Sequence, residues 1–322
     1  MMSARHTSKP KHWAQIREVT SVLGIRFLFQ VNYFFGKLPF RIVMYPILIW
    51  HLLRKSEARL ASKNYLRRVK NMQHPALPDP GMTAVFRHFV AFSENLLDTL
   101  RVWNGLIRTE DVMFFGEKPL VELIDKGTGC LLICAHFGNL ELCKLLSGKR
   151  PGLKITMLVH TRHAEKFNAL LKEVNVQSSL NLMQVTEITP ATAILLAEKV
   201  RQGEFVVIAG DRIPVSDHPR VTTVPFLGEN APFPVGPWIL ANLLQCPVYL
   251  IFSIPAEKGY EIHFEFFHGV IRMSRRERNA ICAELAAAYA RRLEHYCLKT
   301  PLQWFNFYDF WHLPARNTDD AH

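Results

Sequence analysis

The chain has 322 residues, 49% of them apolar and 21% charged, which excludes a disordered protein and gives enough length to bury a large core. Its net charge of +11 is local, because residues 1–70 carry 14 basic and 2 acidic side chains whereas residues 71–322 carry 25 and 26. Six cysteines stand scattered without paired metal-ligand spacing, which favours buried reduced thiols over a disulfide framework or a zinc site.

The first part of the chain, residues 1–80, is predicted to be a basic helical region separate from residues 81–322. It begins with a polar, basic segment without the features of a signal peptide. The longest uncharged run, residues 42–53, is shorter than the roughly 20 residues that cross a bilayer. Basic residues among Trp and Phe suit helices that lie on an anionic membrane. The alternative is a helical hairpin folded on the core, with its charges solvated.

Two further helices are predicted around a turn-rich linker at residues 74–81. Residues 56–72 form a basic helix that suits either an acidic acyl carrier protein or lipid headgroups. No base-reading motif accompanies these charges, so we expect no nucleic-acid partner. Residues 82–104 carry an apolar stripe at helical spacing, which predicts an amphipathic helix.

From residue 112 onward short apolar runs alternate with helical patterns, which predicts an α/β domain. The expected strands are 112–115, 130–135, 154–159, 182–185, 205–209, 221–226, 248–253 and 260–267. The expected helices are 117–125, 139–147, 162–173, 190–201, 234–245 and 275–299.

The junction between the strand at 130–135 and the helix at 139–147 carries candidate catalytic residues. His136 follows the strand, Asn139 is a good N-cap, and Glu141 falls in the first helical turn. Ligands of open α/β sheets bind where strands end and helices begin. If the chain turns at Gly138, His136 and Glu141 meet, and a histidine held by a carboxylate through one ring nitrogen keeps the other as a base. The alternative is a histidine that only caps the strand end.

Two other strand ends carry polar residues. Gly210, Asp211 and Arg212 follow the apolar strand 205–209, and an arginine fork suits a phosphate group. Asp211 would orient Arg212, or the two would form a structural pair. Arg162 follows the strand 154–159, where a binding role and a solvated helix start remain equal alternatives.

The order of several motifs resembles one family. The segment HFGNLE at 136–141 resembles the His-x4-Asp/Glu motif of the lysophospholipid-type acyltransferase superfamily, and in particular of the bacterial lipid A biosynthesis acyltransferases. Similar motifs follow the family order at residues 59–66, 88–98, 210–212, 224–252 and 303–311. The resemblance implies a mixed central sheet flanked by helices, as in glycerolipid acyltransferases, with a helical N-terminal region that associates with a membrane.

The resemblance also implies residue roles. His136 would be the general base and Glu141 its orienting carboxylate. The loop at 226–237, which includes Gly228, would help line the substrate site. The expected substrate-binding residues are Arg212, Asp211, Gly210, Arg162, Asn139 and Gly228.

The implied reaction moves a fatty acyl group from acyl-ACP or acyl-CoA, as co-substrate, to a hydroxyl or amine of a membrane lipid or glycolipid. No metal or other cofactor is expected. The implied location is the cytoplasmic face of a bacterial inner membrane, peripheral or monotopic. Two alternatives remain: a non-catalytic membrane-surface lipid-binding protein on the same fold, or an acyl thioesterase.

Overall fold

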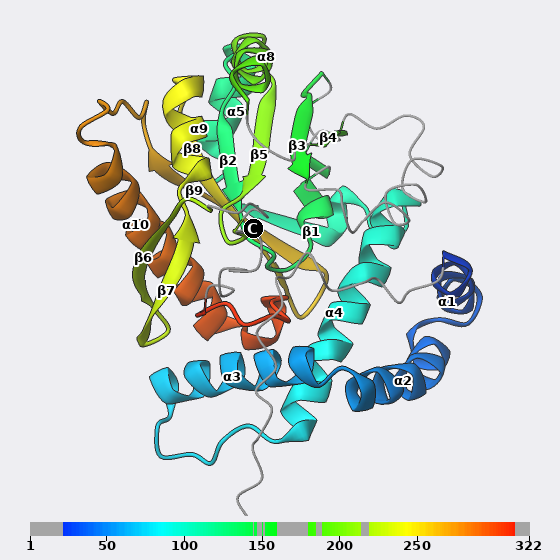
Figure 1. Cartoon of the computed structure of the whole chain (residues 1–322). Helices are drawn as coiled ribbons and strands as arrows, with labels where there is room; N and C mark the ends of the chain where they lie inside the picture. The colour runs from blue at the N-terminus through cyan, green and yellow to red at the C-terminus, as the bar shows by residue number, and fades with distance from the viewer. Residues whose placement is uncertain are drawn as a thin grey trace, which may run out of the picture.

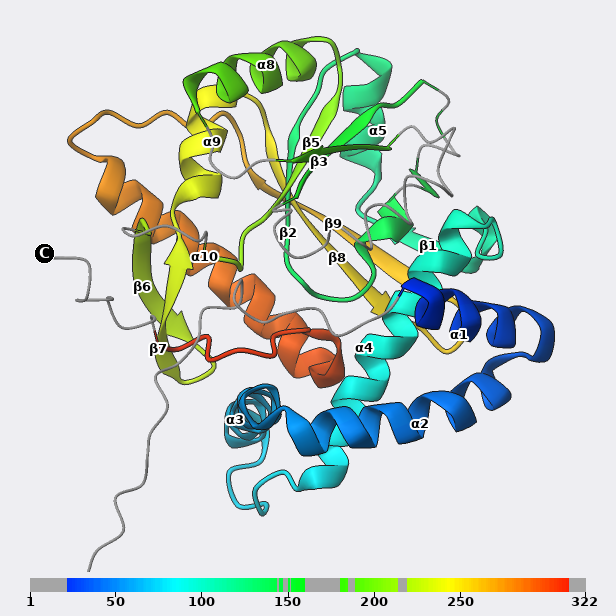
Figure 2. The same cartoon turned by 45° about the vertical axis from the view of Figure 1, so that its right-hand side comes forward.

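The computed structural model describes residues 22–143, 145–146, 150, 152–159, 180–184, 189–213 and 219–312 (Figure 1). The expected helix at 162–173, with Arg162, lies outside these residues. A sheet lies at the centre of the described chain, with helices on both faces (Figures 1 and 2).

The central sheet is mixed, as expected. It has seven strands in the order β1-β9-β8-β2-β5-β3-β4, and every described neighbouring pair is parallel except β8 with β9. The remaining two strands, β6 and β7, pair as an antiparallel hairpin. The strands are β1 (Val112–Phe115), β2 (Leu131–Cys134), β3 (Ile155–Val159), β4 (Leu180–Gln184), β5 (Phe205–Ala209), β6 (Val221–Phe226), β7 (Glu229–Pro234), β8 (Val248–Pro255) and β9 (Tyr260–His268).

Helices cover the sheet on both faces because successive strand residues point to opposite sides. In β2, Leu131 and Ile133 pack in one core with α8, α9 and α10, whereas Leu132 and Cys134 pack in a second core with α5 and the end of α4. The helices are α1 (Val22–Phe35), α2 (Lys37–Arg54), α3 (Ser56–Gln73), α4 (Met82–Trp103), α5 (Lys118–Asp125), α8 (Pro190–Arg201), α9 (Gly236–Leu244) and α10 (Arg278–Lys299).

Most element boundaries agree with the sequence to within a few residues. Two differ in kind. The expected loop at 226–237 contains β7, which extends from a two-residue hairpin turn at Leu227 and Gly228. The expected helix at 139–147 begins as a 3-10 helix, η3 (Leu140–Cys143). The chain therefore leaves His136 through a tight turn rather than through a regular α-helix.

The N-terminal helices α1 and α2 lie beside α4 (Figure 2). Phe40 and Met44 of α2 pack against Leu97 of α4, while Phe35 and Leu38 remain about 71% exposed. Among the described helices, none combines the length and apolar character that a bilayer span requires.

The expected division at residue 80 stays a prediction. Helix α3 lies on the N-terminal side of that boundary, yet Tyr65, Leu66 and Val69 belong to the same buried core as the sheet. All six cysteines of the chain are buried and unbonded, as expected.

Candidate active site

The register of two central strands places His136 beside Asp211. Strands β2 and β5 are parallel neighbours in which Cys134 pairs with Ala209. His136 and Asp211 each follow two residues later, so they emerge side by side at the carboxyl edge of the sheet. This is the edge at which open α/β sheets bind ligands.

A glycine turn shapes the loop after His136. Gly138 has φ of 62°, and a Cβ atom there would lie 1.8 Å from the backbone oxygen of Ser253. Only glycine fits this conformation and this approach. The loop then pairs with the C-terminal aromatic segment, since Gly138 N donates to Gln303 O at 2.9 Å and Phe305 N donates to His136 O at 2.8 Å. Two distant parts of the chain thus fix the backbone around the imidazole.

The Asp211 carboxylate is almost fully buried, with 1% of its side chain exposed. It accepts hydrogen bonds at 2.9 Å from the His136 backbone N, from His136 Nδ1 and from Trp304 Nε1. Burial acts to raise the pKa of Asp211, but His136, Arg212 and the Trp304 hydrogen bond outweigh it, so the pKa lies below its usual value. The group is therefore a carboxylate at neutral pH.

The partner of this carboxylate, His136, is 40% exposed at its side chain. An ionised carboxylate can only accept, so Nδ1 carries the proton and Nε2 holds the free lone pair of the neutral ring. Desolvation and the positive charge of Arg212 lower the pKa of His136, more than Asp211 raises it. The neutral base is thus the main form at pH 7.

A second buried histidine supports the first through Trp304. Burial lowers the pKa of His88 to about 4, so its ring is neutral. Its Nε2 lies 2.9 Å from Trp304 O and its Nδ1 lies 2.9 Å from Ser62 Oγ. Because a carbonyl can only accept, Nε2 donates to Trp304 and Nδ1 accepts from Ser62. A chain of hydrogen bonds therefore runs from α3 through α4 and Trp304 to Asp211 and His136.

The pairing expected for Glu141 is corrected by this geometry. The carboxylate on Nδ1 of His136 is Asp211, and the Glu141 carboxylate accepts from Trp103 Nε1 of α4 at 3.0 Å. No pattern in the sequence reveals the order of the strands, so Asp211 could not be recognised as the neighbour of His136. Asn139 caps the turn as expected: its Oδ1 accepts from Glu141 N at 3.1 Å.

Arg212 lies next to Asp211 in the chain and contacts the C-terminal aromatic segment. Its Nη2 donates to Phe305 O at 3.1 Å, and its guanidinium lies 5.1 Å from the centre of the Tyr308 ring. Asp211, which was expected to orient it, instead holds His136. At Gly210 a Cβ atom would lie 2.8 Å from the Tyr289 ring, so this glycine lets α10 pack closely beneath the site.

One expected binding residue lies elsewhere. Gly228 occupies the hairpin turn between β6 and β7, where its Cβ position faces Met72 of α3, so its place is that of a turn residue. Among the described residues, no group of three or more His, Cys, Asp or Glu side chains could hold a metal. The absence of any cofactor stays a prediction.

Sequence reasoning missed the role of Trp304. The aromatic segment 303–311, which the sequence marked only as a motif in the family order, packs on the core: Trp304, Phe305, Phe310 and Trp311 are buried. The contact between His136 and Asp211 was also missed, although the sequence places the two residues alike. Both His136 and Asp211 stand two residues beyond an apolar strand.

A comparison with family models agrees with the family that the motifs resemble. The model described as bacterial lipid A biosynthesis acyltransferase matches residues 104–312, which include His136, Asp211 and Trp304. No curated protein matches the chain. The match spans most of the chain and every strand of the central sheet. The protein therefore belongs to the bacterial lipid A biosynthesis acyltransferase family, and it is an acyltransferase.

Proposed function

We propose that the protein transfers a fatty acyl group from an acyl thioester to a hydroxyl or amine of a membrane lipid, with His136 as general base and Asp211 as the carboxylate that orients it. The observation that carries this proposal is the accessible imidazole of His136, whose Nδ1 is held by a buried carboxylate. A neutral histidine in this setting is suited to take a proton at Nε2.

In the proposed reaction the acceptor oxygen or nitrogen attacks the thioester carbonyl carbon. Its proton passes to Nε2 of His136, and Asp211 stabilises the imidazolium that forms. The carbon–sulfur bond then breaks, and the proton passes from His136 to the departing thiolate. The products are the acylated lipid and a free thiol. Because the acceptor attacks the thioester directly, the acyl group is never covalently attached to the enzyme.

Arg212 would stabilise the negative charge on the tetrahedral intermediate. The backbone amides of His136 and Gly138 already donate to Asp211 and Gln303, so these two amides do not serve the oxyanion in this proposal. The positive charge of Arg212 lowers the pKa of both His136 and Asp211, which supports a place for Arg212 near the reacting atoms.

The donor is proposed to be acyl-ACP, with acyl-CoA as the alternative. Acyl carrier protein is acidic, and the basic excess of residues 1–70 would attract it. Comparing the two donors at equal concentration, with the same acyl chain, decides between them.

The proposed location is the cytoplasmic face of a bacterial inner membrane. Large apolar side chains are exposed along α1 and α2, among them Phe34, Phe35, Leu38, Ile42 and Trp50. Together with the basic residues of this region, they suit a helix pair that lies at the headgroup level of an anionic membrane.

The decisive experiment replaces His136 with Ala and follows both thiol release and lipid acylation. The expected result is loss of both, with His295→Ala as control because His295 is an exposed residue of α10. Unchanged acyl transfer in His136→Ala would refute the general-base role. Thiol release with free fatty acid and no acylated lipid in the wild type would indicate the thioesterase alternative. Lipid binding without thiol release would indicate the non-catalytic alternative.

A further inference from the structure

Two motifs of the sequence, at residues 59–66 and 88–98, take no direct part in the proposed reaction, yet each contributes a polar side chain to the interior. Ser62 of α3 and His88 of α4 are both 0% exposed, and Ser62 Oγ lies 2.9 Å from His88 Nδ1. With no exposed surface, neither residue can bind a substrate, a partner or a lipid. The two helices that carry them are bonded instead to the C-terminal segment at 301–305.

Helices α3 and α4 hold this segment at two backbone carbonyls. The Tyr65 hydroxyl of α3 donates to Pro301 O at 2.8 Å, and His88 Nε2 of α4 donates to Trp304 O at 2.9 Å. The Trp304 carbonyl also accepts from Asn306 N at 2.9 Å. That second bond lies within one turn of the chain, whereas the His88 bond joins the turn to a helix. The place of Trp304 in the fold therefore depends on α4.

Trp304 in turn fixes both groups of the proposed catalytic pair. Its Nε1 donates to the buried Asp211 carboxylate at 2.9 Å, and its backbone forms a β-bridge with Phe137. The next residue, Phe305, donates from its backbone N to His136 O at 2.8 Å. A shift of this segment would therefore move the carboxylate and the backbone of the base together.

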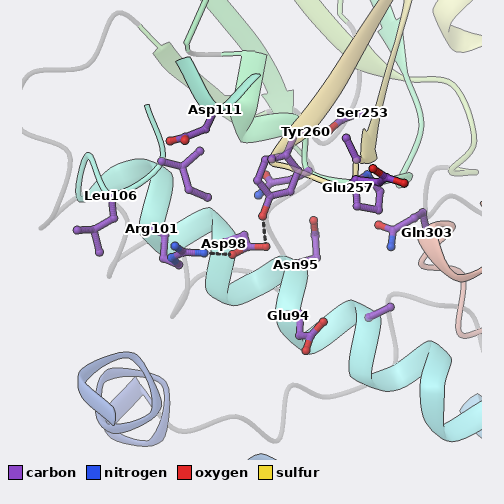
Figure 3. Close-up of a pocket in the computed structure, with 17 residues that line it drawn as sticks. Glu94, Asn95, Asp98, Arg101, Leu106, Asp111, Ser253, Glu257, Tyr260 and Gln303 are labelled. Atoms are coloured by element: carbon purple, nitrogen blue, oxygen red, sulfur yellow. Dashed lines mark hydrogen bonds and ion pairs between the residues drawn. The ribbon is translucent and has the colours of Figure 1, made fainter. Parts of the chain in front are cut away.

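Helix α4 can act as a support because it is anchored itself. Further along the helix from His88, Asp98 accepts from the Tyr260 hydroxyl of β9, beside a pocket of about 430 Å³ that borders the catalytic loop (Figure 3). At the end of the helix, Trp103 Nε1 donates to the Glu141 carboxylate at 3.0 Å. The helix is thus bonded to the sheet and to the catalytic loop as well as to the C-terminal segment.

A histidine suits this place because its two ring nitrogens have different roles. Burial lowers the pKa of His88 to about 4, so the ring stays neutral and carries one proton. Ser62 donates to Nδ1, which selects the tautomer with that proton on Nε2, facing Trp304 O. The rings of Tyr65 and Phe307 flank the imidazole, with centroids at 5.6 and 4.8 Å. The orientation of the donor is therefore set from several sides.

We propose that Ser62 and His88 are positioning residues for acyl transfer: by holding the Trp304 carbonyl, they keep Asp211 and the backbone of His136 in place. This inference rests on the proposed general-base mechanism. Because neither residue touches a substrate, their loss lowers kcat and leaves KM nearly unchanged.

His88→Gln and His88→Asn test the proposal as a matched pair. The glutamine amide can take the place of Nε2 and donate to Trp304 O, whereas the shorter asparagine amide reaches only the place of Nδ1, beside Ser62. Both variants lose the buried ring, so both should lose stability in urea unfolding. The kcat for thiol release should fall about 10- to 100-fold in His88→Asn, as for a small misplacement of reacting groups, and much less in His88→Gln.

A milder variant and a spectroscopic signal extend the test. Ser62→Ala removes one hydroxyl and should lower kcat by about two- to tenfold, the range for a neutral hydrogen bond. The indole N–H resonance of Trp304, assigned by its absence in Trp304→Phe, reports the bond to Asp211. In ¹⁵N-tryptophan spectra it should move upfield in His88→Asn and in Ser62→Ala, because that bond lengthens.

Thr156→Val is the matched control for the loss of a buried hydroxyl. Thr156 is 0% exposed and donates to the Glu204 carboxylate. It pairs with Val206 near the amino end of β5, away from the edge that carries the catalytic groups. This variant should lose stability while kcat and the Trp304 resonance stay unchanged.

Equal kcat in His88→Gln and His88→Asn, or an unmoved Trp304 resonance in His88→Asn, would overturn the proposal. If the His88 variants do not fold, Ser62→Ala decides, and an unchanged kcat there overturns it. His136→Ala separates this inference from the proposed function. Loss of thiol release in His136→Ala with equal kcat in the two His88 variants refutes the positioning role alone, whereas retained thiol release in His136→Ala refutes the general-base mechanism itself.

Discussion

Replacing Trp304 with Phe tests whether the buried indole holds the catalytic carboxylate. The substitution keeps an aromatic ring but removes the hydrogen bond that Trp304 Nε1 donates to Asp211 Oδ2 at 2.9 Å. A hydrogen bond to a charged group contributes about 1.5–3 kcal/mol. If this bond keeps Asp211 in the orientation that holds Nδ1 of His136, kcat/KM should fall about 10- to 100-fold.

The pH dependence separates this role from simple packing. The Trp304 hydrogen bond lowers the pKa of Asp211, so its loss raises that pKa and makes Asp211 a stronger base towards His136. The pKa of His136 then rises as well, because a more basic carboxylate favours the imidazolium. Both changes move the acid limb of the kcat/KM profile to higher pH.

Trp238→Phe is the matched control for the lost volume. Trp238 is as deeply buried in the same core, and its Nε1 has no hydrogen-bond partner among the described residues. Both variants should lose some stability in urea unfolding, but only Trp304→Phe should shift the pH profile. An unshifted profile with unchanged kcat/KM would refute the positioning role of Trp304.

Three further predictions follow from the same contacts. Asp211→Asn should lower kcat/KM by about 100-fold or more, in the range for general-base catalysis. Glu141→Gln keeps an oxygen acceptor for Trp103, so it should lower kcat/KM less. Steady-state kinetics that reversed this order would contradict the pairing of His136 with Asp211. The pKa of His88 is about 4 in the folded state and about 6.5 in the unfolded chain, so protonation of this ring favours unfolding. Its contribution should lower the free energy of unfolding by about 2 kcal/mol between pH 7 and pH 5. Urea titrations of His88→Gln at the two pH values should not show this contribution. Phe35→Ser should lower the affinity for anionic vesicles, measured by co-sedimentation, by about tenfold, as expected for the loss of about 1.5 kcal/mol of apolar burial. Phe266→Ser removes an equally large exposed ring from β9 and should leave this affinity unchanged. Equal losses in the two variants would contradict a membrane-binding face on α1.

Much of the fold could be read from local patterns. Apolar runs of strand length alternate with helical patterns from residue 112, and these patterns depend only on neighbours in sequence. The helix predicted at 190–201 is confirmed as α8, and Thr189 caps it, since Thr189 Oγ1 accepts from Thr192 N at 3.2 Å. Strand β7 was missed because Pro232 and Pro234 suggested a loop, and the hairpin register tolerates them at this edge.

The sequence by itself identified His136 and the segment around Asp211 as chemical positions, because each polar residue follows a buried strand. Only the tertiary structure paired them. The order of strands is set by packing across the whole core, so no local pattern reveals that β2 and β5 are neighbours. The same holds for Trp304, which reaches Asp211 across 93 residues of sequence. Contacts of that range depend on how the helices and strands pack, and for that reason the carboxylate that holds the imidazole became visible only in three dimensions.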